Sequence, residues 1–245
     1  MKIMISPSKT QESRLNLDKK LSTPKFTEKT MELVEKIKTF SKEDLAKIMA
    51  IEGDILENTY SAYLNFHQTP PKACISRYHG LVFKGLDLLN YSEENWNYLQ
   101  NSLVILSALY GCLKPFDGIK PYRLDMKMKV MEGGLYHFWQ NELSTEFLKE
   151  DIVINLASSE FSKLIRRNFI DIEFLECSRD EKTKKEKYKN LGTYNKQARG
   201  FILDYMVKEK ITNVEKIKNF NKAGYSLNEG LSTDTKLVFT RKSPT

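Results

Sequence analysis

A nearly continuous apolar run followed by a proline-stiffened loop is the feature that most limits how this chain can fold. The run extends from Leu103 to Tyr110, and the loop after it reaches Arg123. A short run of this kind is typical of a strand buried inside a sheet. Pro115 and Pro121 restrict the loop backbone. Because loops mounted on rigid strands commonly carry function, we expect binding or catalytic groups here; the alternative is a crossover whose charges serve only solubility.

Ionisable side chains are dense in this loop. Asp117 and Tyr122 are candidate proton-transfer groups, and the three basic residues are candidate contacts to an anion. These basic residues are Lys114, Lys120 and Arg123.

Alternating apolar and polar segments predict an α/β or α+β fold, a single domain over residues 1–245 with a mixed β-sheet surrounded by helices. No repeat or long linker marks a boundary. Strands are predicted at 2–5, 73–78, 103–110, 152–156 and 170–177, with a closing hairpin of 225–227 and 236–240. Helices are predicted at 27–40, 41–49, 55–66, 92–99, 135–148 and 194–208, and the Lys/Glu-rich segment 181–189 is predicted to be an exposed turn.

Composition excludes several classes of protein. Hydrophobic residues make up 40% of the chain, and no apolar run approaches the roughly 20 residues of a membrane span. The start of the sequence does not have the pattern of a signal peptide. The cysteines Cys74, Cys112 and Cys177 are scattered, which indicates reduced thiols and a cytoplasmic location. Neither they nor the three histidines have metal-ligand spacing, so we predict no metal and no cofactor.

Polar clusters directly follow three of the predicted strands. They are residues 6–10, which include Lys9, the loop that ends at Arg123, and residues 158–160. Ligands of open α/β sheets bind beyond the carboxyl ends of the strands. If the strands are parallel, the three clusters converge on one cleft, where a buried Lys9 could act as a general base.

Three other patterns have both a functional and a structural interpretation. Ser158 and Ser159 form an anion site or a simple helix N-cap. Lys196 and Arg199 share one helix face, which is an anion clamp or a solvated surface. Residues 41–66 are a degenerate helix-hairpin-helix, with Lys47 facing a phosphate, or two packed helices joined by a turn.

Blocks along nearly the whole chain resemble the YaaA family of peroxide-stress proteins. The blocks are residues 5–10, 79–87, 105–111, 113–126, 135–139, 155–161, 196–200, 224–225 and 238–241. The resemblance implies a compact mixed fold, a basic cleft, a helix-hairpin-helix and binding to DNA. It also implies a link to hydrogen peroxide survival and to low free intracellular iron. Lys9, Lys114, Arg123 and Arg199 fall in the matching blocks and would line the cleft.

Two functions remain open from the sequence, both in keeping with a net charge of +7. The first is a stress protein whose basic cleft binds DNA without sequence specificity and limits iron-driven damage. The second is an enzyme acting on a small anionic or nucleotide-like substrate in the same cleft, with Arg123 and Ser158 holding the anion. Direct iron sequestration is a third alternative, for which no ligand spacing is present.

Overall fold

The computed structural model describes residues 1–12, 15–179 and 185–242. Within them, eight strands form one mixed sheet in the order β4-β3-β1-β6-β7-β10-β9, and β8 pairs with β7. Two further short strands, β2 and β5, pair with each other. The strands are β1 (Lys2–Ile5), β2 (Lys72–Ala73), β3 (Leu103–Ser107), β4 (Gly111–Leu113), β5 (Gly118–Ile119), β6 (Val153–Asn155), β7 (Ile170–Arg179), β8 (Glu186–Lys189), β9 (Ser226–Leu227) and β10 (Lys236–Lys242).

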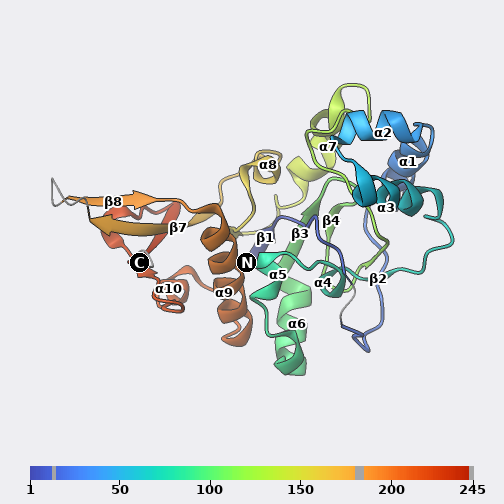
Figure 1. The fold of residues 1–245 in the computed structure, drawn as a ribbon. Helices are drawn as coiled ribbons and strands as arrows, with labels where there is room; N and C mark the ends of the chain where they lie inside the picture. The colour runs from blue at the N-terminus through green and yellow to red at the C-terminus, as the bar shows by residue number, and fades with distance from the viewer. Residues whose placement is uncertain (13–14, 180–184, 243–245) are drawn as a thin grey trace.

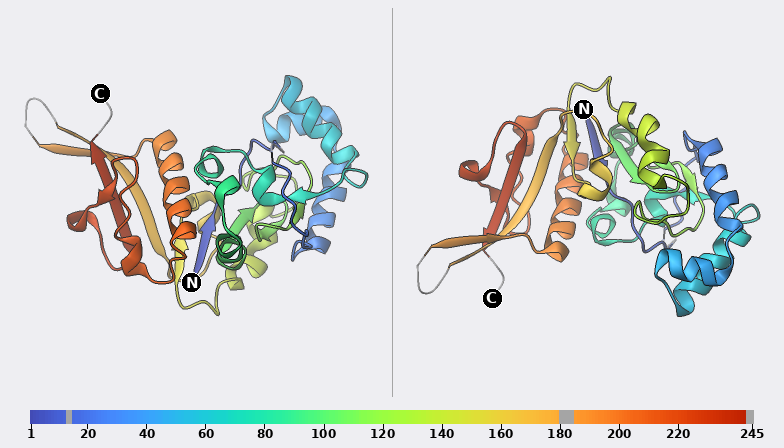
Figure 2. Two further views of the ribbon diagram at one scale, coloured as in Figure 1. Left: turned by 90° about the horizontal axis from the view of Figure 1, so that it is seen from below. Right: turned by 90° about the horizontal axis from the view of Figure 1, so that it is seen from above.

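Helices surround this sheet, as the sequence predicts. Figure 1 shows α1, α2 and α3 at one end of the molecule and the β7–β8 arm with α10 at the other, and both views of Figure 2 agree. No helix in the described part of the chain is long and apolar enough to cross a membrane. The helices are α1 (Thr27–Lys38), α2 (Lys42–Met49), α3 (Gly53–Leu64), α4 (Cys74–Arg77), α5 (Leu81–Lys84), α6 (Glu93–Ser102), α7 (Gly134–Thr145), α8 (Ser159–Ser162), α9 (Gly192–Lys208) and α10 (Val214–Ile217), with 3₁₀ turns η1 (Leu88–Asn90) and η2 (Glu229–Leu231).

The centre of the sheet is parallel and contains a topological switch point. β1 pairs in parallel with β3 on one side and with β6 on the other. β6, β7 and β10 continue the parallel pairing, while β4, β8 and β9 are antiparallel additions. The chain leaves β1 towards β3 and leaves β6 towards β7. The connections therefore diverge between β1 and β6, where open α/β sheets form their ligand crevice.

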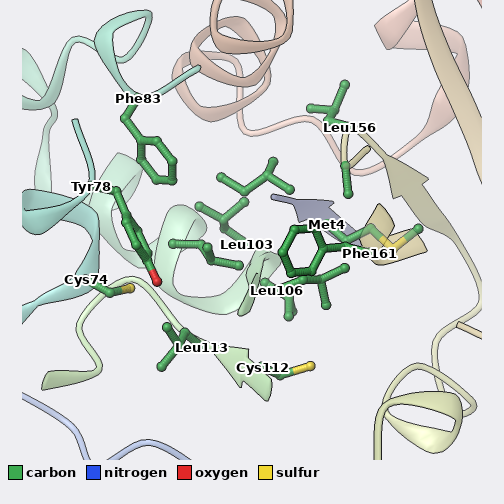
Figure 3. Close-up of a cluster of buried hydrophobic side chains, with 14 of the residues drawn as sticks. Met4, Cys74, Tyr78, Phe83, Leu103, Leu106, Cys112, Leu113, Leu156 and Phe161 are labelled. Atoms are coloured by element: carbon green, nitrogen blue, oxygen red, sulfur yellow. The ribbon is translucent and has the colours of Figure 1, made fainter. Parts of the chain in front are cut away.

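The buried strands explain the apolar runs of the sequence. Every residue of β3 is buried, and Ile3, Met4 and Ile5 of β1 have no exposed surface. Figure 3 shows Met4 and Leu106 packed with Phe161, which follows β6. A parallel strand covered on both faces has no polar alternation, so a continuous apolar run was the correct signal for it.

The strand predicted at 103–110 is shorter in the structure. β3 ends at Ser107, whose Oγ accepts hydrogen bonds from the backbone N–H groups of Leu109 (3.3 Å) and Tyr110 (3.1 Å). The hydroxyl thereby closes a turn, and β4 returns antiparallel to β3. The run stays buried beyond the end of the strand, so hydrophobicity alone did not reveal the hairpin.

The prediction of a strand at 73–78 was wrong. Only the two residues of β2 are extended, and the chain then forms the helical turn α4. Its backbone hydrogen bonds run from Tyr78 N–H to the Cys74 carbonyl (3.0 Å) and from Cys74 N–H to the Asp117 carbonyl (2.9 Å). Short apolar runs do not separate a buried helix from a buried strand, and here tertiary hydrogen bonds decided.

The segment 41–66 contains two helices joined by a turn. Asp44 N–H donates to Ser41 Oγ (3.1 Å), which confirms the capping signal that begins α2. Ala50 has a φ of 49° and ends α2, and α3 begins three residues later. Of the predicted exposed turn at 181–189, residues 181–184 lie outside the described residues, and Glu186–Lys189 form β8.

Two glycines allow α5 and α9 to touch through their backbones. A Cβ added at Gly200 would lie 2.3 Å from the Val82 carbonyl oxygen, and one added at Gly85 would lie 2.8 Å from the Gly200 backbone. No side chain fits between these helices. The contact fixes the position of Arg199, the residue before Gly200 on α9, relative to α5.

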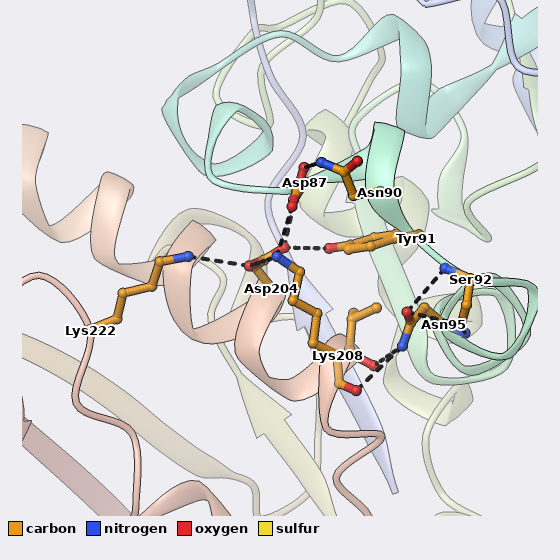
Figure 4. Close-up of polar contacts among 9 residues, drawn as sticks. Asp87, Asn90, Tyr91, Ser92, Asn95, Asp204, Lys208 and Lys222 are labelled. Atoms are coloured by element: carbon orange, nitrogen blue, oxygen red, sulfur yellow. Dashed lines mark hydrogen bonds and ion pairs between the residues drawn. The ribbon is translucent and has the colours of Figure 1, made fainter.

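A buried carboxylate strengthens the same junction. Asp204 of α9 is 1% exposed and accepts a hydrogen bond from Asp87 N–H at 3.0 Å. It accepts a second one from Tyr91 Oη–H at 2.9 Å, which Figure 4 shows. Lys208 and Lys222 form ion pairs with it at 3.2 and 3.3 Å. These contacts join α9 to the segment between α5 and α6, so α9 is held rigidly beside the sheet.

Candidate functional site

A cavity of about 520 Å³ lies at the switch point, beyond the carboxyl ends of β1 and β6. All three predicted polar clusters contribute to it. The reason is that β1 pairs in parallel with both β3 and β6, so the segments that follow these strands start from the same edge of the sheet. α5 and α9 complete the walls. The lining residues are 6–11 after β1, 80–83 around α5, 122–125 of the proline-stiffened loop, Leu156, Ser158, Glu160 and Phe161 after β6, and Lys196 and Arg199 of α9.

Two serines connect the ends of β1 and β6. Ser158 N–H donates to Ser6 Oγ at 2.8 Å, and the two hydroxyl oxygens are 3.1 Å apart. Ser158 occupies the N-cap position of α8, yet its side chain makes no capping hydrogen bond. Its hydroxyl therefore contacts Ser6 and faces the cavity, whereas Ser159 is exposed and outside the lining.

Backbone hydrogen bonds hold the segment after β1 in place. Tyr122 N–H donates to Gln11 Oε1 (3.1 Å), and His79 N–H donates to the Thr10 carbonyl (3.0 Å). Thr10 N–H in turn donates to Ser8 Oγ (3.1 Å). The three walls of the cavity are thus linked before any ligand arrives, which is the preorganisation that a binding site requires.

Three basic side chains of the cavity have no partner among the described residues. Arg123, Lys196 and Arg199 make no side-chain hydrogen bond or ion pair with any residue that the structure describes. The Nε atoms of Arg123 and Arg199 are buried as well as unpaired. Buried polar groups are nearly always satisfied, so unpaired guanidinium groups beside a cavity point to an anion that completes their hydrogen bonds.

Burial lowers the pKa of the Arg199 guanidinium from its usual value, and the negative charges of Asp171 and Glu173 oppose that shift. Asp171 is itself held by Asn155, whose amide donates to its Oδ1 at 2.6 Å. An arginine titrates so far above neutral pH that it stays charged. The site therefore contains a partly desolvated positive charge on Arg199, which the negative charges of Asp171 and Glu173 stabilise.

The fourth basic group differs from the other three. Lys9 Nζ is 2.6 Å from Asp125 Oδ2, and its side chain is 61% exposed. The general-base role predicted for Lys9 requires burial, which this exposed, paired ammonium does not have. Lys9 and Asp125 stand at the mouth of the cavity as an ion pair that an incoming anion could open.

Tyr122 lines the cavity, but its hydroxyl is turned into the protein. Its Oη is 2.8 Å from Ser107 Oγ and 2.8 Å from Tyr78 Oη. Ser107 already accepts from two backbone N–H groups, so its hydroxyl donates to Tyr122, and Tyr122 donates to Tyr78. Burial raises the pKa of Tyr122 to about 12.

Asp117 organises the loop and does not line the cavity. Its Oδ1 accepts from Ser22 Oγ–H (2.6 Å) and its Oδ2 accepts from Lys114 N–H (2.8 Å). It is 3% exposed, and burial raises its pKa while these hydrogen bonds oppose the rise.

The raised pKa of Asp117 predicts a pH-dependent effect of Asp117→Asn. The folded carboxyl binds its proton more tightly than the unfolded one, so its contribution to stability is full below about pH 3.9 and is lost as the pH rises through the folded pKa. The free energy of unfolding of the Asn variant, relative to wild type, should therefore increase between pH 3.5 and 7 in urea titrations. Asp117→Ala, which removes both acceptors, should destabilise by about 2 kcal/mol. A relative stability that does not change with pH would contradict this assignment.

The remaining predicted basic residues lie away from the cavity. Lys114 is exposed, and Lys47 is exposed on α2. Lys120 Nζ donates to the backbone carbonyls of Phe66 (2.6 Å) and His67 (3.2 Å), just beyond the end of α3. Their roles in binding an anion stay predictions.

Sequence reasoning missed two acidic residues and one helix of the cavity. Asp125 and Glu160 line it; Glu160 lies inside the predicted polar cluster 158–160, and Asp125 follows two residues after the loop that ends at Arg123. Leu81, Val82 and Phe83 of α5 form an apolar wall. The signal for α5 was the glycine-flanked block 80–85, whose glycines allow the close approach to α9.

The fold and the cavity together define an α/β protein with a preorganised, electropositive ligand cleft at the switch point of a mostly parallel sheet. The peroxide stress protein YaaA family matches residues 1–231. A UPF0246 protein of Fusobacterium nucleatum is 39% identical over 99% of this chain and all of its own length. UPF0246 proteins of Clostridium beijerinckii and Agathobacter rectalis are 36% and 35% identical, with at least 98% of both chains covered. The chain therefore belongs to the YaaA family of peroxide stress proteins.

Two of the three cysteines are in environments that disfavour reaction with peroxide. Cys74 and Cys112 are buried, and burial raises the pKa of both thiols. Cys177 is partly exposed. No group of three or more histidine, cysteine or acidic side chains with metal-binding geometry occurs among the described residues.

We therefore expect thiol reagents to modify only Cys177 in the folded protein, because the thiolate is the reactive form and burial suppresses it. Peptide mass spectrometry after iodoacetamide treatment should show this pattern, and treatment in 6 M urea, with no folded protein left, should label all three. Labelling of Cys74 in the folded protein at the rate of Cys177 would contradict the prediction.

Proposed function

We propose that this peroxide stress protein acts in the cytoplasm by binding a phosphate-bearing ligand of nucleotide size in the cleft. The observation that carries the proposal is the set of three unpaired basic side chains, Arg123, Lys196 and Arg199, around one cavity. Two of them are arginines, whose planar groups bind phosphate oxygens in pairs.

The size of the cavity favours a small ligand. Pockets for small molecules commonly measure about 300–1,000 Å³, and about 520 Å³ falls inside that range. The apolar wall of Leu81, Val82 and Phe83 faces the same space and suits the flat face of a base. An enzyme acting on such a ligand would use the serine pair at the ends of β1 and β6 to orient the phosphate.

Binding to DNA without sequence specificity is the second candidate, and the exposed basic groups support it. Lys9 and Lys196 stand at the cavity mouth and the net charge is +7, so phosphates of a strand could contact the rim while one nucleotide enters the cleft. Protection of DNA from iron-driven damage would follow from that contact. The segment 41–66 adds little to it, because its acidic residues outnumber its two lysines; they are Glu43, Asp44, Glu52, Asp54 and Glu57.

Equilibrium titrations separate these functions. Isothermal titration with nucleoside monophosphates and inorganic phosphate tests the small-ligand site. Fluorescence anisotropy with single- and double-stranded DNA at 50 and 200 mM salt tests the other, since each phosphate contacted steepens the salt dependence. We expect a nucleotide to bind with a micromolar dissociation constant, and DNA to compete only weakly with it. Tight, steeply salt-dependent DNA binding with no nucleotide binding would replace the first proposal by the second, and the absence of both would overturn the cleft as a phosphate site.

A further inference from the structure

Glu160 is an acidic side chain in a cavity with four basic ones. Its Oε1 accepts a hydrogen bond from Met126 N–H at 3.0 Å, and its backbone carbonyl accepts from Tyr136 Oη–H at 3.0 Å. These two contacts come from separate segments of the chain. The carboxylate is therefore held in one orientation at the edge of the cavity.

The second carboxylate oxygen of Glu160 has no partner within the part of the chain that the structure describes. None of the described residues donates a hydrogen bond to Oε2, and no lysine or arginine among them lies within 4.0 Å of the carboxylate. No ion pair therefore joins Glu160 to a basic group of the cavity among the described residues. The lining combines three basic side chains, Arg123, Lys196 and Arg199, with two carboxylates, Glu160 and Asp125, of which Asp125 is paired with Lys9.

The free carboxylate oxygen limits what can bind. A phosphate beside Glu160 would be repelled, so the phosphate of the ligand belongs beside Arg123, Lys196 and Arg199. An ionised carboxylate oxygen can only accept hydrogen bonds, so its partner in the ligand must be a donor. A hydroxyl group is such a donor and carries no charge. In dinucleotide-binding α/β folds an acidic side chain accepts hydrogen bonds from ribose hydroxyls at the corresponding crevice.

We infer that Glu160 accepts a hydrogen bond from a ribose hydroxyl and makes the cleft selective for ribonucleotides over deoxyribonucleotides. The inference rests on the proposed binding of a phosphate ligand of nucleotide size. Glu160 then distinguishes ribose from deoxyribose, while the arginines bind the phosphate. If the carboxylate only held Met126 in place, the cleft would not distinguish the two sugars.

Glu160→Gln separates these two roles. The amide oxygen can still accept from Met126 N–H, but the group towards the cavity becomes a donor and no longer accepts from a hydroxyl. Glu146→Gln is the matched control, because Glu146, the residue that follows α7, pairs with Lys25 and does not line the cavity.

The test is isothermal titration of the wild type and both variants with the four ribonucleoside 5′-monophosphates, their 2′-deoxy counterparts and inorganic phosphate. We expect the wild type and the Glu146→Gln protein to prefer the best ribonucleotide about tenfold or more, as one charge-assisted hydrogen bond allows. In Glu160→Gln the preference should fall below about threefold, while inorganic phosphate binds equally or better because a negative charge is gone.

The outcomes distinguish a failure of this inference from a failure of the proposed function on which it rests. If the wild type binds both sugars equally, or if Glu160→Gln keeps the preference, the assignment of Glu160 is wrong and phosphate binding in the cleft survives. If the wild type binds neither nucleotides nor phosphate, the proposed function fails, and the assignment of Glu160 falls with it. Thermal unfolding of each variant, compared with wild type, shows whether a change in binding reflects loss of fold.

Discussion

Arg199→Met should weaken binding of the phosphate ligand by about 30- to 100-fold without lowering the stability of the fold. The loss follows from removing two charge-assisted hydrogen bonds, each contributing about 1.5–3 kcal/mol before partial compensation by solvent. Stability should hold or rise, because the wild-type guanidinium is buried without a hydrogen-bond partner for its Nε and methionine fills similar space. Titration of the ligand and thermal unfolding measure the two effects.

Two control variants make the Arg199 prediction specific. Arg199→Lys keeps the charge but not the planar pair of donors, so we expect an intermediate loss of affinity. Lys114→Ala removes an exposed lysine outside the cavity and should change affinity less than about twofold, as surface charges do under physiological salt. Equal losses in Arg199→Met and Lys114→Ala would show that only net charge matters and that the cavity is not the binding site.

Gly200→Ala should destabilise the protein by about 3 kcal/mol or more, near the upper end of overpacking effects. The added methyl group would lie 2.3 Å from the Val82 carbonyl oxygen, and backbone atoms of α5 cannot rotate away as a side chain could. Urea denaturation measures the loss. Because α5 and α9 both line the cleft, ligand binding should weaken under conditions in which the variant remains folded.

Gly192→Ala is the matched control on the same helix. No atom lies within 4 Å of a Cβ added at Gly192, so the change should be neutral or slightly stabilising through the higher helix propensity of alanine. If Gly200→Ala were as stable as Gly192→Ala, the backbone contact between α5 and α9 would not be the element that positions Arg199.

Membership of a peroxide-stress family raises the question of whether a cysteine of this protein reacts with peroxide itself. A protein that destroyed peroxide through a thiol would hold that thiol in an exposed site that stabilises the thiolate. Cys74 and Cys112 are buried, with pKa values raised by desolvation, so only the partly exposed Cys177 could be such a thiol. The cleft, whose arginines lack a partner among the described residues, is the basis of the proposal that the protein acts through a bound anion.

Much of the fold was predictable from local patterns. The buried strands β1 and β3 appeared as apolar runs, and the serine at the start of α2 appeared as a capping signal. The polar clusters after the strands also indicated where a cleft could form, because parallel strands bring their carboxyl ends to one edge. The helical turn at 73–78 was not predictable, since its hydrogen bonds go to Pro115 and Asp117 of a distant loop.

The sequence by itself determined which segments are buried, which residue types follow each strand and which family the blocks resemble, because these depend on side-chain chemistry and local order. Only the tertiary structure decided which charges are paired. It placed Lys9 against Asp125 and buried Asp117 within its own loop. Around one cavity it left three basic side chains with no partner in residues 1–12, 15–179 and 185–242, namely Arg123, Lys196 and Arg199. Charge pairing falls off over a few ångströms in space and is independent of separation along the chain, so no local pattern records it.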